Sequence, residues 1–395
     1  MKPKLLIITN RFVIGGPAFH VAELTRFLQD DFDVLIVGGI AGKGEETNID
    51  MFEGLKSEPV TVEGFSRIFN PLSDYRAYRK IKKIIAEFKP DIVHTHTFKP
   101  GFIGRLAARS LKVKTIVHTF HGNLFTGYFH PFISRLLVLI ERFLARKSSA
   151  IIALSPKQKD ELVKKYRVAG SDKIRLIFPG IAKERFSPDA EKRKAFREKY
   201  KLEDDEIALG IIGRLVTVKN IKLFIDGIKH LIDSGFSKVT GFIVGDGKQK
   251  YELTEYCKKT GLDFVRFSYQ KNKAPIVFTG WCKDITSVYQ GVDAVVLTSL
   301  NEGTPYSLLE AQAAGKPVIT ADVGGVSDIV DSGKSAFVFK EREEFFGFLE
   351  KVVGDRNLRL QMGEKGKAFI KQGFDSQKMA LETKKLYLEL IRPPA

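Results

Sequence analysis

Short runs of apolar residues without a polar break recur along this 395-residue chain, each followed by a glycine-rich turn or a helical pattern. Strands that are apolar at every position are buried on both faces, as in parallel sheets that helices cover on both sides. The alternation of such runs with amphipathic segments therefore predicts an α/β fold with doubly wound parallel sheets. The clearest runs are residues 4–9, 32–37, 115–120, 150–154, 207–212, 239–244 and 294–297.

The strand-and-helix pattern occurs twice. The first series ends near residue 154, a charged stretch with two prolines follows over 179–188, and the second series begins at 207. Each series is long enough for a Rossmann-like domain of its own. Ligands of open α/β sheets bind beyond the carboxyl ends of the strands, so two such domains would place a substrate site between them.

Composition narrows the class of protein. Two cysteines exclude a disulfide framework and a cysteine-rich zinc site, and they are typical of a reducing compartment. The first residues hold an apolar run too short for a signal peptide, and no run approaches the roughly 20 residues of a membrane span. We expect a soluble, cytoplasmic protein.

The charge is unevenly distributed. The 64 basic and 47 acidic residues give a net +17, of which +12 lies in residues 1–182 and +5 in residues 183–395. Such an excess favours an anionic partner, which could be nucleic acid, a membrane surface or a phosphorylated substrate. No nucleic-acid reader motif is present, so nucleic acid ranks last.

Two basic amphipathic helices are expected in the first half, over 75–88 and 132–146. The second would carry apolar Phe132, Leu136, Leu139, Ile140 and Phe143 beside arginines. A surface of this kind suits an anionic membrane, on the inner face of the cell membrane for a cytoplasmic protein. The alternatives are an ordinary core helix and a solvated charged face.

The segment 299–311 combines several features of a ligand site directly after a strand. Thr304 is expected to cap a helix with Pro305 at its first position, which leaves the amides of Tyr306 and Ser307 facing an anion. Glu302 precedes this helix and Glu310 lies within it. Carboxylates accept hydrogen bonds from hydroxyl groups, so two of them beside an anion site suit a nucleotide sugar.

Other motifs do not support a metal or a second cofactor. Asp31-Phe32-Asp33 lies away from the strand ends and is expected to be a solvated turn. His94 and His96 alternate on a strand without an acidic or cysteine partner, which favours a packed or hydrogen-bonded pair. Gly245-Asp246-Gly247 lacks the third glycine of a dinucleotide fingerprint, and Gly333-Lys334-Ser335 lacks the first glycine of a P-loop. We expect no metal and no cofactor beyond a nucleotide-sugar co-substrate.

Several motifs in a fixed order resemble the retaining glycosyltransferases of family 4. They are Gly15-Gly16, His121 after a strand, Gly213-Arg214 with Lys219, Phe278-Thr279-Gly280, and Glu302 with Gly303, Pro305 and Glu310. The resemblance covers nearly the whole chain and implies a GT-B fold. It implies an acceptor domain of residues 1–182 plus 376–395, because the last helix crosses back, and a nucleotide-sugar domain of residues 183–375.

The resemblance also implies roles for single residues. His121 would contact the donor sugar, Glu302 its hydroxyls, Glu310 the ribose, and Arg214 with Lys219 the diphosphate. Attack would occur on the face that the leaving phosphate occupies, without a metal. The catalytic set is His121, Arg214, Lys219 and Glu302, and the donor-binding set is Gly15, Gly16, Trp281, Cys282, Gly303, Thr304, Pro305, Tyr306, Ser307 and Glu310.

Residues 122–130 (GNLFTGYFH) resemble bacterial transferases that build surface polysaccharides on a lipid carrier. The expected activity is transfer of a hexose from a UDP- or GDP-linked donor to a lipid-linked saccharide. Two alternatives remain, a nucleotide-sugar 2-epimerase of similar shape and a non-enzymatic binder of lipid or nucleic acid. The sequence indicates no oligomeric state.

Overall fold

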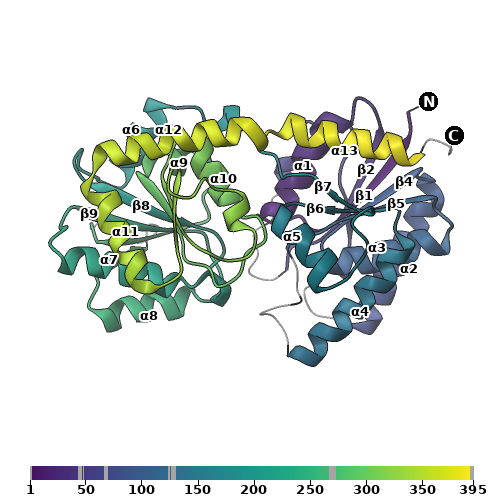
Figure 1. Cartoon of the computed structure of the whole chain (residues 1–395), viewed down its shortest axis with the longest axis horizontal. Coiled ribbons are helices and arrows are strands. Elements are labelled where there is room, and N and C mark those ends of the chain that lie inside the picture. Colours follow the sequence, from purple (N-terminus) through teal and green to yellow (C-terminus); the bar gives the residue numbers. More distant parts are fainter. Residues whose placement is uncertain are drawn as a thin grey trace. The chain divides into compact units, whose positions relative to one another are not determined.

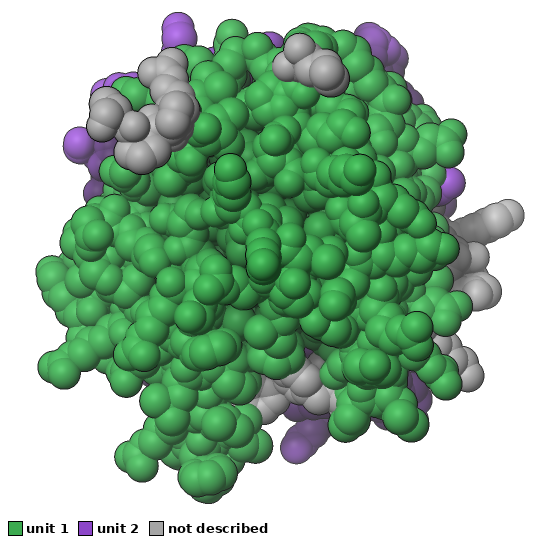
Figure 2. Space-filling view, turned by 90° about the vertical axis from the view of Figure 1, so that its right-hand side faces the viewer, with its two compact units in different colours: residues 1–180, 375–395 green, residues 181–374 purple. Residues whose placement is uncertain are grey.

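The computed structural model describes residues 2–42, 47, 49–65, 70–122, 125, 130–266 and 273–391. The chain forms two compact units, shown in Figures 1 and 2: unit 1 is Met1–Gly180 with Asp375–Ala395, and unit 2 is Ile181–Phe374. The boundaries expected from the sequence, 182/183 and 375/376, lie close to these. No helix among the described residues is long and apolar enough to cross a bilayer.

The described part of unit 1 is built on a parallel sheet of seven strands in the order β3-β2-β1-β4-β5-β6-β7. Consecutive residues of a strand face opposite sides of a sheet. In β1, Leu5 and Ile7 accordingly enter one core while Leu6 and Ile8 enter another, so both faces are covered. The strands are β1 (Lys4–Arg11), β2 (Asp33–Gly39), β3 (Val60–Val62), β4 (Ile92–His96), β5 (Thr115–Thr119), β6 (Ala150–Ala153) and β7 (Ile174–Leu176).

Where a proline is the first residue of a helix in unit 1, the helix begins earlier than the sequence indicated. The helix expected over 75–88 begins at Pro71, because Asn70 caps it by accepting a hydrogen bond from the Ser73 amide, 3.1 Å away. The helices are α1 (Gly16–Leu28), α2 (Pro71–Phe88), α3 (Phe98–Ser110), α4 (Pro131–Lys147) and α5 (Pro156–Asp160), followed by a π-helical turn, Glu161–Lys165.

The last helix, α13 (Ser376–Ile391), belongs to unit 1 although it ends the chain. Figure 1 shows it in yellow alongside α1 and the first strands. Met379, Leu386 and Tyr387 are buried in the same core as Leu5 and Ile7. The tertiary burial of these side chains, rather than their local sequence, makes unit 1 discontinuous.

Unit 2 repeats the architecture with a parallel sheet in the order β10-β11-β9-β8-β12-β13-β14 in its described part. The strands are β8 (Ile207–Ile212), β9 (Val239–Val244), β10 (Phe264–Arg266), β11 (Ile276–Gly280), β12 (Ala294–Leu297), β13 (Val318–Ala321) and β14 (Ala336–Phe339). The helices are α6 (Ala190–Lys199), α7 (Ile221–Asp233), α8 (Lys250–Thr260), α9 (Ile285–Gly291), α10 (Tyr306–Ala313), α11 (Arg342–Gly354) and α12 (Arg356–Gly373).

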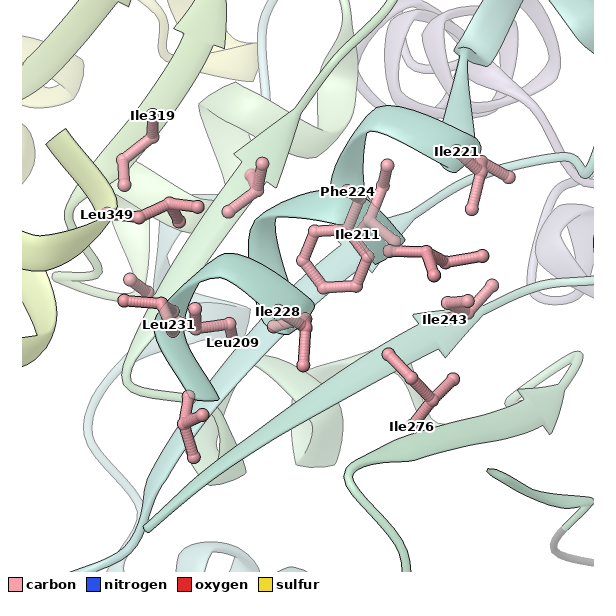
Figure 3. Close-up of a cluster of buried hydrophobic side chains, with 14 of the residues drawn as sticks. Leu209, Ile211, Ile221, Phe224, Ile228, Leu231, Ile243, Ile276, Ile319 and Leu349 are labelled. Atoms are coloured by element: carbon pink, nitrogen blue, oxygen red, sulfur yellow. The ribbon is translucent and has the colours of Figure 1, made fainter. Parts of the chain in front are cut away.

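The core of unit 2 lies largely between α7 and the sheet. Phe224, Ile228 and Leu231 recur at helical spacing and point toward Leu209 and Ile243 of the central strands, as Figure 3 shows. All five side chains are fully buried. This packing fixes α7 behind β8, and the loop that joins the two therefore has a defined position.

Removing the phenyl ring of Phe224 tests how much this core contributes to the stability of unit 2. Phe224→Ala should lower the unfolding free energy of unit 2 by about 3–5 kcal/mol, because it leaves a cavity at a site with no exposed surface. Urea unfolding followed by circular dichroism measures the change. Tyr251→Ala is the matched control, since Tyr251 is 72% exposed and should cost little; equal effects of the two substitutions would contradict the packing described.

Candidate active site

Two loops at the carboxyl edge of the unit 2 sheet are held together by hydrogen bonds. The hydroxyl of Thr298, just after β12, donates to the carbonyl oxygens of Lys219 (3.1 Å) and Asn220 (2.9 Å), which follow β8. The Leu300 amide donates to the Val218 carbonyl at 2.8 Å. Neighbouring parallel strands end at one edge, and these bonds then fix the two loops against each other.

The loops bring Lys219 and Glu302 into contact. The Lys219 ammonium lies 2.6 Å from Oε1 of Glu302, and the Ser299 hydroxyl donates to the same oxygen at 2.6 Å. The two charged side chains are 17% and 13% exposed. The pair is therefore shielded from bulk water, yet it remains accessible to a ligand.

Glycine is required beside this pair. Gly324 has φ +54, and a Cβ there would lie 1.7 Å from the Glu302 carbonyl oxygen. The Gly325 amide donates to the Gly303 carbonyl at 3.0 Å. The loop after β13 thus presses against the backbone of the Glu302 loop, which only a residue without a side chain permits.

The cap expected at the next helix is wrong. Helix α10 begins at Tyr306 with Pro305 as its N-cap residue, and no side chain caps it, whereas Thr304 had been expected to do so. The reason is local: Pro305 has ψ 115°, outside the helical region, and proline also disfavours a helical conformation at the residue before it. The Ser307 amide lies in the first turn of α10, where α-helical geometry supplies no acceptor, whereas the Leu308 amide donates to the Pro305 carbonyl at 3.1 Å.

Glu310 lies in α10 and is buried. Its Oε2 accepts a hydrogen bond from the Tyr289 hydroxyl at 2.7 Å, and the ring of Phe186 packs against Tyr289. Burial raises the pKa of Glu310 to about 7, although the Tyr289 hydroxyl and the charge of Arg185 act in the opposite direction. Glu310 therefore exchanges its proton near neutral pH, a property that could not be predicted from the sequence.

The raised pKa of Glu310 predicts a pH-dependent stability. Because the folded pKa of about 7 exceeds the unfolded value near 4.5, the folded state holds the proton more tightly between these values. Stability should fall as pH rises through this window, by about 3 kcal/mol in total. Urea unfolding of the wild type and Glu310→Gln from pH 4.5 to 8 measures it. The difference between them should grow with pH, and a constant difference would contradict the assignment.

The loops after β9 and β11 complete this edge. The Gly245 amide donates to the Gly280 carbonyl at 2.9 Å, and a Cβ on Gly245 would lie 2.0 Å from the Gly213 carbonyl oxygen. Close packing of backbone explains this glycine without a dinucleotide. Trp281 and Cys282 follow directly, both partly exposed. Residues 267–272, between β10 and β11, lie outside the described residues.

Arg214 follows Gly213 at the end of β8 and is partly buried. Gly213 has φ +151, and a Cβ there would lie 3.4 Å from Cε of Lys219. The structure thus brings Arg214, Lys219 and Glu302 to one edge of unit 2, with the N-terminus of α10 in the adjoining segment. Among the sequence candidates, Trp281, Cys282, Gly303, Thr304, Pro305, Tyr306, Ser307 and Glu310 belong to loops or helices of this same edge.

The remaining candidates are in unit 1. Gly15 precedes α1 in an extended conformation, and a Cβ there would have open space within 4 Å. Neither backbone strain nor internal packing requires glycine at this position. Gly16 is the first residue of α1. His121 follows β5, and its Nε2 lies 2.9 Å from Nδ1 of His96. Burial lowers the pKa of His121 well below its usual value, so the ring is neutral at pH 7.

Some residues that lie at these sites were not predicted from the sequence. The prediction of a hydrogen-bonded histidine pair holds for His94, which contacts the Tyr387 hydroxyl (2.5 Å) and the Thr119 hydroxyl (2.7 Å). His20, whose ring lies 4.8 Å from that of His121, was not singled out. Tyr289 and Ser299 were missed as well. Only spatial proximity identifies Tyr289 and His20, whereas Ser299 stands three residues before Glu302.

Comparison with known proteins shows the family to which the chain belongs. Residues 14–185 match the family model described as Glycosyltransferase Family 4, and residues 192–369 match that described as Glycosyl transferases group 1. These two matches define a glycosyltransferase, and the two Rossmann-like units are those of the GT-B fold. The chain belongs to glycosyltransferase family 4, as its motifs indicated, and it is a hexosyltransferase.

Two similar proteins are bacterial glycosyltransferases by name. The UDP-Gal:alpha-D-GlcNAc-diphosphoundecaprenol alpha-1,3-galactosyltransferase of Escherichia coli is 28% identical over 326 residues, which is 81% of each chain. The capsular polysaccharide biosynthesis glycosyltransferase CapM of Staphylococcus aureus is 28% identical over 81% of this chain and 82% of its own.

Among solved structures, Anabaena Alr3699/HepE in complex with UDP-glucose matches with a TM-score of 0.78 at 20% identity, covering 98% of this chain and 99% of its own. At this level of identity the likeness shows the fold. The predicted α/β class with two Rossmann-like domains is confirmed.

Proposed function

We propose that this protein transfers a hexose from a UDP- or GDP-linked donor to a lipid-linked saccharide, with retention of configuration and without a metal. The observation that carries the proposal is the contact of Lys219 with Glu302 at the edge where β8 and β12 end, beside the uncapped N-terminus of α10. This edge offers cations and amides for a diphosphate and carboxylates for sugar hydroxyls.

Charge complementarity supports the roles of Arg214 and Lys219. The leaving diphosphate gains negative charge as the bond to the sugar breaks, and fixed cations stabilise that charge where it develops. Lys219 already neutralises Glu302 in the free protein, so a diphosphate would compete for the ammonium group. Glu302 would then turn its oxygens to hydroxyls of the sugar. These groups supply the stabilisation that a metal provides in other transferases.

Glu310 suits the ribose of the donor. A ribose diol donates two hydrogen bonds, which favour the ionised carboxylate and lower its pKa. Nucleotide binding should therefore release a proton near pH 7 and tighten as pH rises from 6 to 8. This pH dependence of nucleotide binding arises from the raised pKa of Glu310, which the burial of its side chain produces.

Retention of configuration follows from attack on the face of the leaving phosphate, which itself takes the acceptor proton. In unit 1, the neutral imidazole of His121 would exchange a hydrogen bond with the transferred sugar. Gly15 would let the backbone of the first loop approach the donor, which accounts for a glycine that the fold itself does not require.

The relatives support the choice of substrates. The Escherichia coli relative is named for UDP-galactose and a diphosphoundecaprenol-linked acceptor, and HepE binds UDP-glucose. The decisive experiment presents a panel of UDP- and GDP-hexoses with a polyprenyl-diphosphate-linked sugar, and nuclear magnetic resonance assigns the anomeric configuration of the product. An inverted product, or epimerised donor without acceptor, would overturn the proposal.

Substitutions at the ion pair test the donor site. Lys219→Ala and Glu302→Gln should each lower kcat by about 10²–10³, because each removes a group that acts as the bond breaks. Initial rates with the donor found in the panel measure this. Lys222→Ala is the control, since Lys222 pairs with Glu252 on the exposed surface of α7. Full activity in both site variants would remove the assignment.

Helix α4 supports a membrane-bound acceptor. Phe132, Leu136, Leu139 and Phe143 are 72%, 50%, 57% and 52% exposed, so this helix is not an ordinary core helix. Ile140, expected on the same face, is only partly exposed, because the helix turns it toward its buried side.

The charges of α4 are segregated. Its single acidic residue, Glu141, is fully buried and lies 2.7 Å from Nη2 of Arg105 in α3. The exposed charges are the cations Arg135, Arg146 and Lys147. An apolar face rimmed by cations complements an anionic lipid surface, which supports our proposal that the protein binds the cytoplasmic face of the membrane.

Vesicle sedimentation tests this surface. The wild type should bind vesicles containing phosphatidylglycerol more than neutral vesicles, and salt should weaken the binding because it screens the cations. Leu136→Ser with Leu139→Ser should reduce sedimentation about tenfold or more, since each substitution removes exposed apolar area. Tyr251→Ser, which changes a still more exposed side chain in unit 2, should have no effect. Equal binding to neutral and anionic vesicles would refute the role of the cations.

A further inference from the structure

Four imidazole rings gather near the end of β4, on the side of the unit 1 sheet that α1 and α13 cover. The ring centroids of His94 and His96 are 4.1 Å apart, those of His96 and His121 are 5.2 Å apart, and His20 of α1 approaches both. One ligand atom from each of His20, His96 and His121 lies within 4.8 Å of the others. Three separate elements of the fold thus contribute a potential ligand each.

The hydrogen bonds divide these rings into two kinds. Both nitrogens of His94 are engaged, with Tyr387 and Thr119, so this ring is held in place. His96 uses only Nδ1, toward His121, and its Nε2 is buried without a partner among the described residues. His96 has no exposed surface. A buried nitrogen without a partner costs free energy, which a bound ligand would recover.

The protonation state suits metal binding. Burial lowers the pKa of His20 to about 4 and those of His96 and His121 well below the usual value. All three rings are neutral at pH 7 and offer a lone pair, which is the form that binds metal ions. Three imidazoles with a free fourth position match Zn²⁺ and its first-row neighbours, whereas Mg²⁺ and Ca²⁺ prefer oxygen ligands.

We propose that His20, His96 and His121 form a binding site for a divalent first-row transition ion such as Zn²⁺. Nitrogen–metal distances of about 2.0–2.1 Å require the three rings to move closer together, which side-chain rotation of His20 and His121 accomplishes. A water molecule or an anionic oxygen takes the fourth position. Bound metal occupies His121, so it inhibits transfer; this consequence, unlike the site itself, rests on the proposed function.

Metal titration of the full-length protein without a histidine tag tests the site. One Co²⁺ per chain should produce the visible absorption of a four-coordinate complex, and Zn²⁺ should displace it. His20→Gln and His96→Gln should weaken Zn²⁺ binding by at least about tenfold. His230→Gln is the control, because His230 lies in unit 2 and contacts Glu350. Undiminished binding in both site variants would overturn the proposal.

X-ray absorption of the Zn²⁺-loaded wild type gives a result that does not depend on whether the variants fold. It should show three imidazole nitrogens and one oxygen, and two imidazoles or fewer would overturn the site. Zn²⁺ should lower the transfer rate without weakening nucleotide binding, which depends on unit 2. If metal binds as expected while transfer continues, the role of His121 fails and the metal site stands.

Discussion

The common direction of the strands is the constraint on which the rest of this protein depends. In each unit every described strand pairing is parallel, so all carboxyl ends lie at one edge of the sheet. That edge gathers residues far apart in sequence: Lys219 meets Glu302 across 83 positions, and His96 meets His121 across 25. Without this shared direction, neither the charged site of unit 2 nor the histidine cluster of unit 1 would form.

The sequence predicted those parts of the fold that local pattern determines. Buried parallel strands are apolar at every position, so β8, β9 and β12 could be located directly. The start of α10 was wrong by one residue, since the sequence does not show which side of Pro305 becomes helical.

The candidate residues could be predicted from a sequence motif, but the surroundings of their side chains could not. Glu302 and Glu310 look alike in sequence, yet one is paired with a lysine and the other is buried against a phenol. That difference comes from Tyr289, which α9 places beside α10. The cation that pairs with Glu141 of α4 could not be predicted from the sequence either, because Arg105 belongs to a different helix, α3. A charge turned inward there leaves the outer face apolar and cationic.

The position of α13 has a consequence for how the chain matures during synthesis. Met379, Leu386 and Tyr387 complete a core whose strands belong to the first part of the chain. The ribosome therefore releases all of unit 2 before unit 1 can bury that apolar face. Part of the unit 1 core therefore stays exposed while nearly half of the chain is synthesised. Only when α13 packs does Tyr387 fix the ring of His94. A protein whose synthesis stops after residue 374 would contain every strand of both sheets and still lack a finished first unit.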